Sequence, residues 1–330
     1  MKEKVSVIGA GSWGTALAVL AAKQGYEVTL WARKEAESSA LQADRENKKY
    51  LPGVAFPDSL AATSDLQAAM KDAKIVILAV PSRGVREIAK KLAPLVQEDQ
   101  ILVNVAKGLE EGSLLRLSQV IRQEIPHVRL CVLSGPSHAE EVGKDIPTTC
   151  LVASEDEETA KTVQQAFMSP TFRLYTNTDV IGVEIGAALK NIIALAAGMS
   201  DGLGYGDNTK AALMTRGMTE MKRLGIAMGG KAETFFGLSG IGDLIVTCTS
   251  MHSRNRRAGI LLGQGKSLEE TLAEVQMVVE GVNTVQAAVK LAKEYQVSMP
   301  ITESIYAVLF EGKDVHVAIM ELMTREGKAE

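Results

Sequence analysis

The stretch KVSVIGAGSWGTALAVLAAKQGYEVTLWARKE, residues 4–35, decides the fold of this chain. An apolar run at 5–8 leads into the glycine turn GAGSWG at 9–14, an alanine-rich helical run follows, and a second apolar run covers 28–31. Strand, glycine turn, helix and strand in this order are typical of a right-handed βαβ unit. The sequence therefore predicts a Rossmann-type, doubly wound α/β sheet in the N-terminal half.

The three glycines of the turn have separate expected tasks. Gly9 allows the tight turn, Gly11 lets the backbone approach a pyrophosphate, and Gly14 lets the helix pack closely on the sheet. The free N–H groups and the dipole at the helix start favour phosphate binding. A merely structural turn is the alternative, but the strand before it and the helix after it favour a dinucleotide site.

The end of the second strand indicates which dinucleotide binds. An NAD-specific unit places a carboxylate there for the ribose 2′-OH, whereas this chain reads Trp31-Ala32-Arg33-Lys34. Two cations suit a 2′-phosphate through charge-assisted hydrogen bonds. They could instead be solvated charges at a helix start, and Glu35 is a possible ribose partner. The sequence favours NADP(H), with NAD(H) possible.

Composition describes an ordinary globular protein of two domains. The chain has 330 residues, 46% hydrophobic and 23% charged, with a net charge of −4, which excludes the basic footprint of a nucleic-acid binder. Three cysteines without metal-ligand spacing indicate buried, reduced thiols in a cytoplasmic protein, and no metal is expected. A signal peptide is rejected because cleavage would destroy the βαβ unit. No apolar run approaches the eighteen or so residues that a membrane span needs, so no span is expected.

Strand-like runs alternate with helical segments as far as residue 175, which is typical of a doubly wound sheet. Residues 36–72 are expected to be mostly helical. Ligands should gather where the strands end, near residues 9–14, 81–82, 107 and 135–139. The expected later strands are 75–80, 101–105, 129–133, 149–153 and 172–175.

After residue 178 the pattern becomes helical. We therefore expect a dinucleotide-binding domain at 1–178 and an all-α substrate and catalytic domain at 179–330. The expected helices of the second domain are 180–200, 208–228, 254–263, 267–276, 283–296 and 301–311.

Lys190 is the leading catalytic candidate. It is the only cation in the apolar, small-residue stretch from Val180 to Met199. A snorkelling lysine on an exposed face is the alternative. A buried ammonium without a task is costly, so we expect an interior lysine that donates a proton, with its pKa lowered by burial and a neighbouring cation. Asn191, the next residue, could hydrogen-bond the substrate.

Other polar residues can support that chemistry. Lys107 follows an apolar strand at the ligand edge, although it could be an ordinary loop lysine. Asp243, a lone carboxylate in a glycine-rich apolar stretch, could anchor Lys190 or a substrate hydroxyl, or could cap a helix. The run Ser253-Arg254-Asn255-Arg256-Arg257 opens a helix and suits a phosphate dianion, or forms a solvated face. Together these groups indicate a small phosphorylated carbonyl or alcohol.

Hydrolase chemistry is not favoured. Ser137 and His138 are adjacent, but no acidic residue is placed by motif to orient the histidine.

Six blocks of the sequence stand out together: GAGSWGTALA at 9–18, KGLE at 107–110, SGPSHAEEV at 134–142, ALKNIIALAAGMSDGLG at 188–204, GIGDLIVTCTSMHSRNRR at 240–257 and VVEG at 278–281. With these blocks the chain resembles, over nearly its whole length, the NAD(P)-dependent glycerol-3-phosphate dehydrogenase family of bacterial type. The resemblance implies reduction of dihydroxyacetone phosphate to sn-glycerol 3-phosphate, the backbone precursor of phospholipids.

The resemblance also implies roles for individual residues. Lys190 is implied as the proton donor and acceptor. The implied substrate contacts are Lys107, Gly135, Ser137, Asp243, Ser253, Arg254 and Asn255. The implied cofactor contacts are Ser12, Trp13, Arg33, Lys107, Ala139, Arg254, Val278 and Glu280.

Two other functions remain open from the sequence. A β-hydroxyacid dehydrogenase shares the Rossmann unit, the all-α domain and a helical lysine, but acts on a carboxylate substrate. A non-enzymic NADP(H) sensor could use the same fold without needing Lys190. The hydrophobic helical half favours a homodimer.

Overall fold

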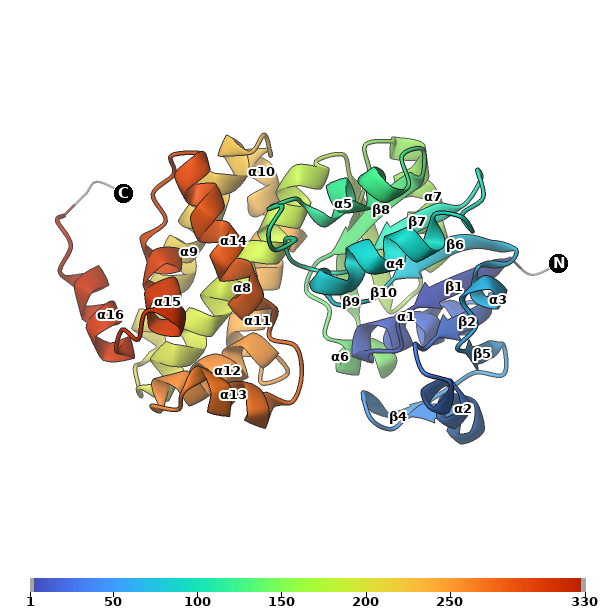
Figure 1. Cartoon of the computed structure of the whole chain (residues 1–330), viewed down its shortest axis with the longest axis horizontal. Helices are drawn as coiled ribbons and strands as arrows, with labels where there is room; N and C mark the ends of the chain where they lie inside the picture. Colours follow the sequence, from blue (N-terminus) through green and yellow to red (C-terminus); the bar gives the residue numbers. More distant parts are fainter. Residues whose placement is uncertain (1–2, 328–330) are drawn as a thin grey trace. The chain divides into compact units, whose positions relative to one another are not determined.

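The computed structural model describes residues 3–327 and divides into two compact units (Figure 1). The first unit holds the described residues up to Lys107 together with Leu115–Val180. The second unit holds Gly108–Leu114 and the described residues from Ile181 onward. The short segment 108–114 belongs to the second unit because Leu109 and Leu114 pack in its hydrophobic core.

An eight-stranded sheet forms the centre of the first unit. Its strand order is β10-β9-β8-β7-β6-β1-β2-β5, and every neighbouring pair is parallel except β8 and β9. This confirms the doubly wound α/β class. The strands are β1 (Lys4–Ile8), β2 (Glu27–Trp31), β5 (Leu60–Thr63), β6 (Ala73–Leu78), β7 (Ile101–Asn104), β8 (Arg129–Ser134), β9 (Thr148–Ala153) and β10 (Phe172–Asn177).

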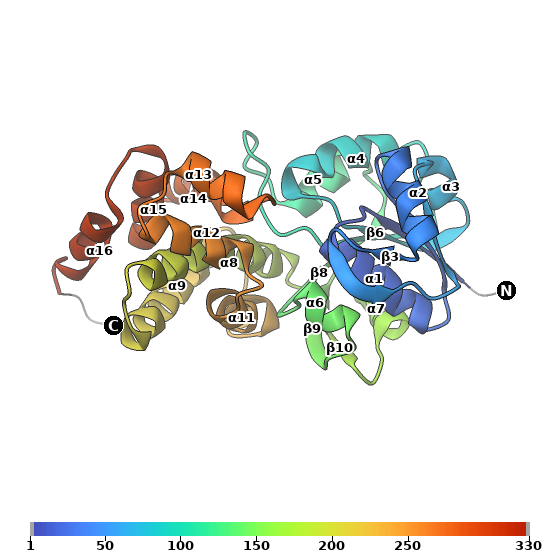
Figure 2. The same cartoon turned by 90° about the horizontal axis from the view of Figure 1, so that it is seen from below.

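Alternation along the strands sends apolar side chains to both faces of this sheet. In β1, Val5 and Val7 pack in one cluster, whereas Ile8 packs in the other. The first cluster includes α1 (Ser12–Lys23), α6 (Ala139–Gly143) and α7 (Glu157–Phe167). The second includes α3 (Leu66–Met70), α4 (Val85–Leu92) and α5 (Leu117–Glu124). Figure 2 shows α4 and α5 on one side of the sheet and α1 and α7 on the other.

The expectation of a mostly helical segment at 36–72 is wrong. Only α2 (Glu35–Asp44) and the short α3 are helical there. Strand β5 extends the main sheet beside β2, and β3 (Glu46–Asn47) pairs with β4 (Leu51–Ala55) in a small antiparallel sheet. Tyr50-Leu51-Pro52-Gly53 and Phe56-Pro57 interrupt the helical pattern, because proline lacks an N–H and glycine weakens a helix.

The described part of the second unit is helical, as expected. A short 3₁₀ turn, η1 (Ser82–Gly84), belongs to the first unit, and a π-helical turn, η2 (Leu238–Gly242), belongs to the second. The helices are α8 (Val180–Gly202), α9 (Asp207–Ala227), α10 (Ala232–Phe235), α11 (Asp243–Thr249), α12 (Arg254–Gly263), α13 (Leu268–Val275), α14 (Glu280–Glu294), α15 (Pro300–Phe310) and α16 (Val315–Met323).

Helix α8 is the core of the second unit and runs through its middle in both views (Figure 2). The expectation that no segment is long and apolar enough to span a membrane is wrong for this helix, since its 23 residues have a mean hydropathy of 1.7 over an 18-residue window. However, 94% of that window is buried inside the protein. Burial of this kind is typical of the central helix of a globular unit.

Candidate active site

The glycine turn is built around backbone contacts that a side chain would block. Gly9 has a φ of +121°, and a Cβ there would lie 2.5 Å from the carbonyl oxygen of Ala79. A Cβ at Gly14 would lie 2.0 Å from the carbonyl oxygen of Gly9. At Gly11, by contrast, a Cβ would meet no atom within 4 Å. Packing therefore requires Gly9 and Gly14, whereas the space beside Gly11 is open to a ligand.

The start of α1 suits an anionic ligand. Gly11 is the N-cap, and no side chain caps the helix there, so backbone N–H groups at this end are available. The indole Nε1 of Trp13 is buried and has no hydrogen-bond partner among the described residues. An open glycine position, a helix start and an unsatisfied donor fit a dinucleotide pyrophosphate. Ser12 lies in the same turn and is buried.

Asn47 supports the turn, and sequence reasoning missed it. Its amide nitrogen donates to the carbonyl oxygen of Ala10 at 3.0 Å and to the hydroxyl of Thr15 at 2.8 Å. The residue is buried, and its side-chain oxygen accepts from the N–H of Tyr50. Asn47 lies in the segment 36–72, which was expected to be mostly helical, and no motif there indicated this role.

Arg33 and Lys34, the basic pair after β2, are exposed. Exposure is consistent both with binding of a 2′-phosphate and with solvated charges at a helix start. Arg33 and Lys34 follow the last strand residue, Trp31, and Glu35 begins α2. All three charged side chains are solvent-accessible. The described structure places two cations and one carboxylate at this strand end.

A second group of expected residues lies where β7 and β8 end. The Nζ of Lys107 donates to the carbonyl oxygen of Gly135 at 3.0 Å, and the Ser137 hydroxyl donates to the same oxygen at 3.0 Å. Gly135 has a φ of +132°, which aims this carbonyl between the two side chains. Ala139 begins α6 directly afterwards. The structure thus brings Lys107, Gly135 and Ser137 together within the first unit.

Lys190 is buried inside the second unit, so the snorkelling alternative is wrong. Its Nζ lies 2.6 Å from Oδ1 of Asp243, and the two side chains are 6% and 2% exposed. The carboxylate stabilises the ammonium form of Lys190, which opposes the effect of burial. Asp243 stands in the first turn of α11 with Gly242 as the N-cap, so it anchors the lysine rather than capping the helix. The expected pairing of Lys190 with Asp243 is confirmed.

Thr247 completes this pair and was missed from the sequence. Lys190 Nζ donates to its hydroxyl oxygen at 2.6 Å, and the hydroxyl donates to the carbonyl oxygen of Asp243 at 2.6 Å. Thr247 follows Asp243 by four residues on α11, so both face the same side of the helix. That spacing is a signal that could have identified it.

Asn191 and Asn255 form a linked pair beside Lys190. The amide nitrogen of Asn255 donates to Oδ1 of Asn191 at 2.9 Å, and Oδ1 of Asn255 accepts from the N–H of Gly281 at 2.8 Å. A Cβ at Gly281 would lie 2.6 Å from the carbonyl oxygen of Asn191. The start of α14, where Glu280 stands, is thereby fixed against α8 and α12.

Helices α8 and α12 meet through glycines. A Cβ at Gly198 would lie 2.1 Å from the carbonyl oxygen of Arg256, and one at Gly259 would lie 2.1 Å from that of Leu195. Direct backbone contact sets the distance between the two helices. This close contact also brings Asn255, near the start of α12, within hydrogen-bond distance of Asn191 on α8.

The arginine run does not act as a single cluster. Arg256 pairs with Asp201 at 2.8 Å and donates to the carbonyl oxygen of Thr249. Arg257 has a buried Nε without a hydrogen-bond partner among the described residues. Arg254 lies 3.5 Å from the carbonyl oxygen of Val278. Arg256 therefore serves an internal ion pair, and the phosphate site expected at this run stays a prediction.

Ser253 is the N-cap residue of α12. Its hydroxyl oxygen accepts from the N–H of Arg256 and caps α12. Since the oxygen accepts, the hydroxyl proton can still be donated to a ligand.

The cysteines are buried, as expected. Cys131 lies in β8, Cys150 in β9 and Cys248 in α11, and none forms a disulfide. Burial raises the pKa of both the Cys131 and the Cys248 thiol to about 12, so neither supplies a thiolate nucleophile.

Known proteins share both units. The model of the NAD-dependent glycerol-3-phosphate dehydrogenase N-terminus matches residues 4–160, and that of the C-terminus matches residues 179–320. A protein of Moorella thermoacetica named glycerol-3-phosphate dehydrogenase [NAD(P)+] is 61% identical, over 98% of this chain and 97% of its own. This chain belongs to the NAD-dependent glycerol-3-phosphate dehydrogenase family.

Two further relatives agree with this assignment. A Desulfitobacterium hafniense protein of the same name is 58% identical, over 99% of this chain and 93% of its own. The crystal structure of glycerol-3-phosphate dehydrogenase from Coxiella burnetii is 39% identical, with a TM-score of 0.95, and covers 98% of this chain and 99% of its own. The family resemblance inferred from the sequence blocks is confirmed.

Proposed function

We propose that this chain is an oxidoreductase that reduces dihydroxyacetone phosphate to sn-glycerol 3-phosphate, reversibly, with a nicotinamide cofactor. The observation that carries the proposal is the buried Lys190–Asp243–Thr247 arrangement beside the Asn191–Asn255 pair. Family membership supplies the substrate class, and the site supplies the groups that a carbonyl reduction requires. We further propose that the first unit is the dinucleotide-binding domain and the second the substrate domain.

The substrate phosphate is assigned to the start of α12. This ten-residue helix presents backbone N–H groups, the Ser253 hydroxyl, and the side chains of Arg254 and Asn255. Holding the phosphate fixes the position of the keto carbon, and orientation of this kind contributes much of the rate of a bimolecular step.

Lys190 is assigned as the proton donor. A bound nicotinamide cofactor would supply a hydride to the keto carbon, and the carbonyl oxygen of the substrate would then need a proton. Lys190 holds that proton on Nζ, while Asp243 and Thr247 fix the position of Nζ. Proton transfer from Nζ to the oxygen completes the alcohol, and solvent restores the ammonium group. We assign Lys107, Gly135 and Ser137 as further substrate contacts, with Lys107 offsetting the charge on the oxygen.

The cofactor site is assigned to the glycine turn. Gly9, Gly11, Ser12, Trp13 and Gly14 would hold the pyrophosphate. The open position at Gly11 and the unsatisfied Trp13 Nε1 support this assignment. The other assigned cofactor contacts are Arg33, Lys107, Ala139, Arg254, Val278 and Glu280.

We propose that NADP(H) is favoured over NAD(H). The supporting observation is the exposed Arg33 and Lys34 at the end of β2, where an NAD-specific unit would carry a carboxylate. Guanidinium and ammonium groups bind a 2′-phosphate by charge and hydrogen bonding, and gain nothing comparable from a ribose hydroxyl.

The experiment follows NADPH absorbance with dihydroxyacetone phosphate, then repeats the assay with NADH. Dihydroxyacetone without the phosphate should be reduced at least about 100-fold less efficiently, because the α12 contacts are lost. A preference for non-phosphorylated hydroxy acids would instead indicate a β-hydroxyacid dehydrogenase. NADPH binding without turnover of any substrate would indicate a sensor.

Three wider assignments accompany this activity. We propose a cytoplasmic location, supported by three buried cysteines that form no disulfide, and a role in supplying glycerophospholipid synthesis. We also propose a homodimer, supported by exposed apolar side chains in the second unit such as Phe236 and Met251. Light scattering coupled to size exclusion measures the mass in solution and tests the dimer.

A further inference from the structure

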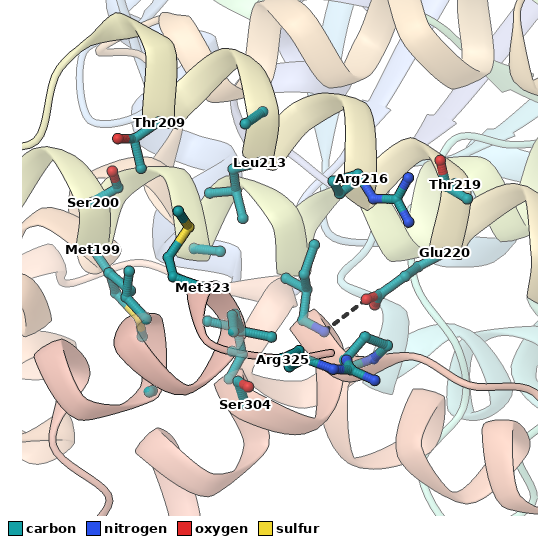
Figure 3. Close-up of a pocket in the computed structure, with 18 of the residues that line it drawn as sticks. Met199, Ser200, Thr209, Leu213, Arg216, Thr219, Glu220, Ser304, Met323 and Arg325 are labelled. Atoms are coloured by element: carbon teal, nitrogen blue, oxygen red, sulfur yellow. Dashed lines mark hydrogen bonds between the residues drawn. The ribbon is translucent and has the colours of Figure 1, made fainter. Parts of the chain in front are cut away.

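The second unit contains a cavity of about 690 Å³ between α8, α9, α15 and α16. None of the residues assigned above to substrate or cofactor lines it. Figure 3 shows its walls, with Met199 and Ser200 on one side and Ser304 and Met323 on the other. A volume of several hundred Å³ is typical of small-molecule sites.

The body of this cavity is apolar. Met199 and Ile305 are buried in its walls, and Leu213, Val308 and Met323 complete them. The flexible thioethers of the methionines adapt to ligands of varied shape. An aliphatic chain would bury its methylenes here without displacing any hydrogen bond.

One end of the cavity is charged. Arg216, Glu220 and Arg223 recur at helical spacing along one face of α9, and Arg325 lies on the opposite wall. Figure 3 places Arg216, Glu220 and Arg325 together, away from Met199 and Ser200. Arg216, Arg223 and Arg325 are exposed, so their guanidinium groups stand at the opening.

Glu220 lies in the same lining as these arginines and also binds the start of α15. Its carboxylate accepts from the N–H groups of Ile301 and Thr302 at 2.7 and 3.1 Å, and from the Thr302 hydroxyl at 3.0 Å. These donors belong to the first turn of α15, so the carboxylate is directed at that helix start. Glu326 also lines this end, so the described lining carries three guanidinium groups against two carboxyl groups, which leaves a net positive charge.

The opposite end holds an unsatisfied polar group. The Ser200 hydroxyl is buried, lines the cavity and has no hydrogen-bond partner among the described residues. A buried hydroxyl without a partner is costly, and a water molecule or a ligand inside the cavity would satisfy it.

Helix α16 is loosely packed over the cavity. Of its nine residues only Ala318 is buried, and Met320 and Met323 are 45% and 73% exposed. A ligand beneath the helix would give its apolar side chains a packing partner.

We propose that this cavity binds a single-chain anionic amphiphile, with its aliphatic chain between α9, α15 and α16 and its anionic head group at Arg216 and Arg223. The shared chemistry of the ligand is an alkyl chain that ends in a carboxylate or a phosphate. Charge complementarity at the opening and the apolar body support this ligand class. The proposal is independent of the dehydrogenase activity.

Isothermal titration of the full chain with dodecanoate, below its micelle concentration, tests the proposal. One site per chain is expected, and affinity should rise from octanoate to dodecanoate by up to about fourfold per methylene. Dodecyl phosphate should bind the same site, and comparing it with dodecanoate distinguishes the two head groups. Dodecyltrimethylammonium should not compete. Equal binding of the cationic and anionic amphiphiles, or no saturable binding, would overturn the proposal.

Paired variants locate the site. Leu213→Trp fills the cavity and should weaken dodecanoate binding at least tenfold, whereas Leu272→Trp, on exposed α13, should not change it. Arg216→Gln should weaken binding about tenfold, whereas Lys290→Gln, at an exposed position on α14, removes the same charge and should have no effect. Circular dichroism confirms that each variant is folded.

A second copy of the chain is the competing occupant. If Leu213→Trp leaves dodecanoate affinity unchanged but converts a dimer to a monomer, the cavity is part of an interface between copies and the amphiphile proposal is wrong.

Discussion

Glycines have opposite tasks in the two units. In the first unit the position beside Gly11 is empty, and a Cβ there would meet no atom within 4 Å. In the second unit the positions beside Gly198 and Gly259 are occupied by carbonyl oxygens of the facing helix, 2.1 Å from where a Cβ would stand. The same residue type leaves space for a ligand in one unit and for the protein's own backbone in the other.

The two candidate lysines differ in a similar way. Lys107 is half-buried and donates to the carbonyl oxygen of Gly135. Lys190 is buried against the carboxylate of Asp243. Lys107 therefore bears a charge near solvent, and its loss should change stability little. Lys190 bears a charge inside the core, and loss of its partner should change stability strongly. Substitution of each lysine site in turn shows whether the charge there contributes to stability or only to binding.

The largest effect on stability is expected at the buried pair. Asp243→Ala leaves the Lys190 ammonium buried without its carboxylate and should lower the free energy of unfolding by about 3–5 kcal/mol. Lys190→Met together with Asp243→Asn removes both charges and should restore most of that loss. Lys107→Met should cost less than about 1 kcal/mol. Urea denaturation of the four proteins measures these differences, and equal losses at Lys107 and Asp243 would remove the contrast between the two sites.

The glycine comparison predicts the next largest effect. Gly259→Ala forces a Cβ against the Leu195 carbonyl and should cost about 3 kcal/mol of stability. Gly11→Ala should leave stability within about 0.5 kcal/mol, because its φ of −77° and ψ of −179° are open to alanine. It should weaken NADPH binding at least about tenfold by blocking the approach of the pyrophosphate. Thermal denaturation and fluorescence titration with NADPH measure the two properties. A stable Gly259→Ala, or an unchanged NADPH affinity in Gly11→Ala, would contradict the assignment.

Glu220, a third buried ionisable group, should make the free energy of unfolding depend on pH. Burial raises the pKa of Glu220 from 4.5 to about 7, although hydrogen bonds from Ile301 and Thr302 oppose the shift. The folded protein then holds a proton that the unfolded chain releases, so the free energy of unfolding falls as pH rises from about 4.5 to 7. The loss for this group is about 3 kcal/mol.

Comparison with Glu220→Gln isolates that contribution. Between pH 5 and pH 8 the wild type should lose stability relative to the variant, as urea midpoints at each pH would show. Glu294→Gln, an exposed change on α14, serves as the control. Parallel pH profiles for the wild type and Glu220→Gln would show that the carboxyl stays ionised throughout this range.

The smallest effect is expected at the exposed cations. Arg33→Gln should lower kcat/KM for NADPH about tenfold and leave that for NADH nearly unchanged, because the loss falls on the 2′-phosphate. Arg173→Gln, an exposed change on β10, should alter neither. Equal losses with both cofactors would show that Arg33 does not distinguish them.

The local patterns of the sequence predicted much of the fold. Continuous apolar runs marked the central strands, because strands buried on both faces lack polar alternation. The segment 36–72 was misread because β3, β4 and β5 have only two to five residues each, which is too short for a clear strand pattern. The alanine-rich core of α8 was underestimated as an apolar run because Glu184 and Lys190 interrupt it.

The candidate site was only partly accessible from sequence. Lys190 and Asp243 were identified because each is an isolated charge in an apolar stretch. Asn47 and the separation of Arg256 from Arg254 were not, because each depends on a partner distant in sequence or on which face of a helix a side chain occupies. Thr247 was also missed, although its spacing of four residues from Asp243 places both on one side of a helix. The pairing of Arg256 with Asp201 spans 55 residues, and no local pattern indicates it.

The central claim is that Lys190 supplies the proton for reduction of dihydroxyacetone phosphate. The most direct measurement is the initial rate of NADPH oxidation with this substrate, for the wild type and for Lys190→Met combined with Asp243→Asn. The account predicts turnover by the wild type, and a double variant that folds and binds NADPH but is at least about 100-fold slower. A folded double variant with a wild-type rate, or a wild type that does not turn over this substrate, would contradict it.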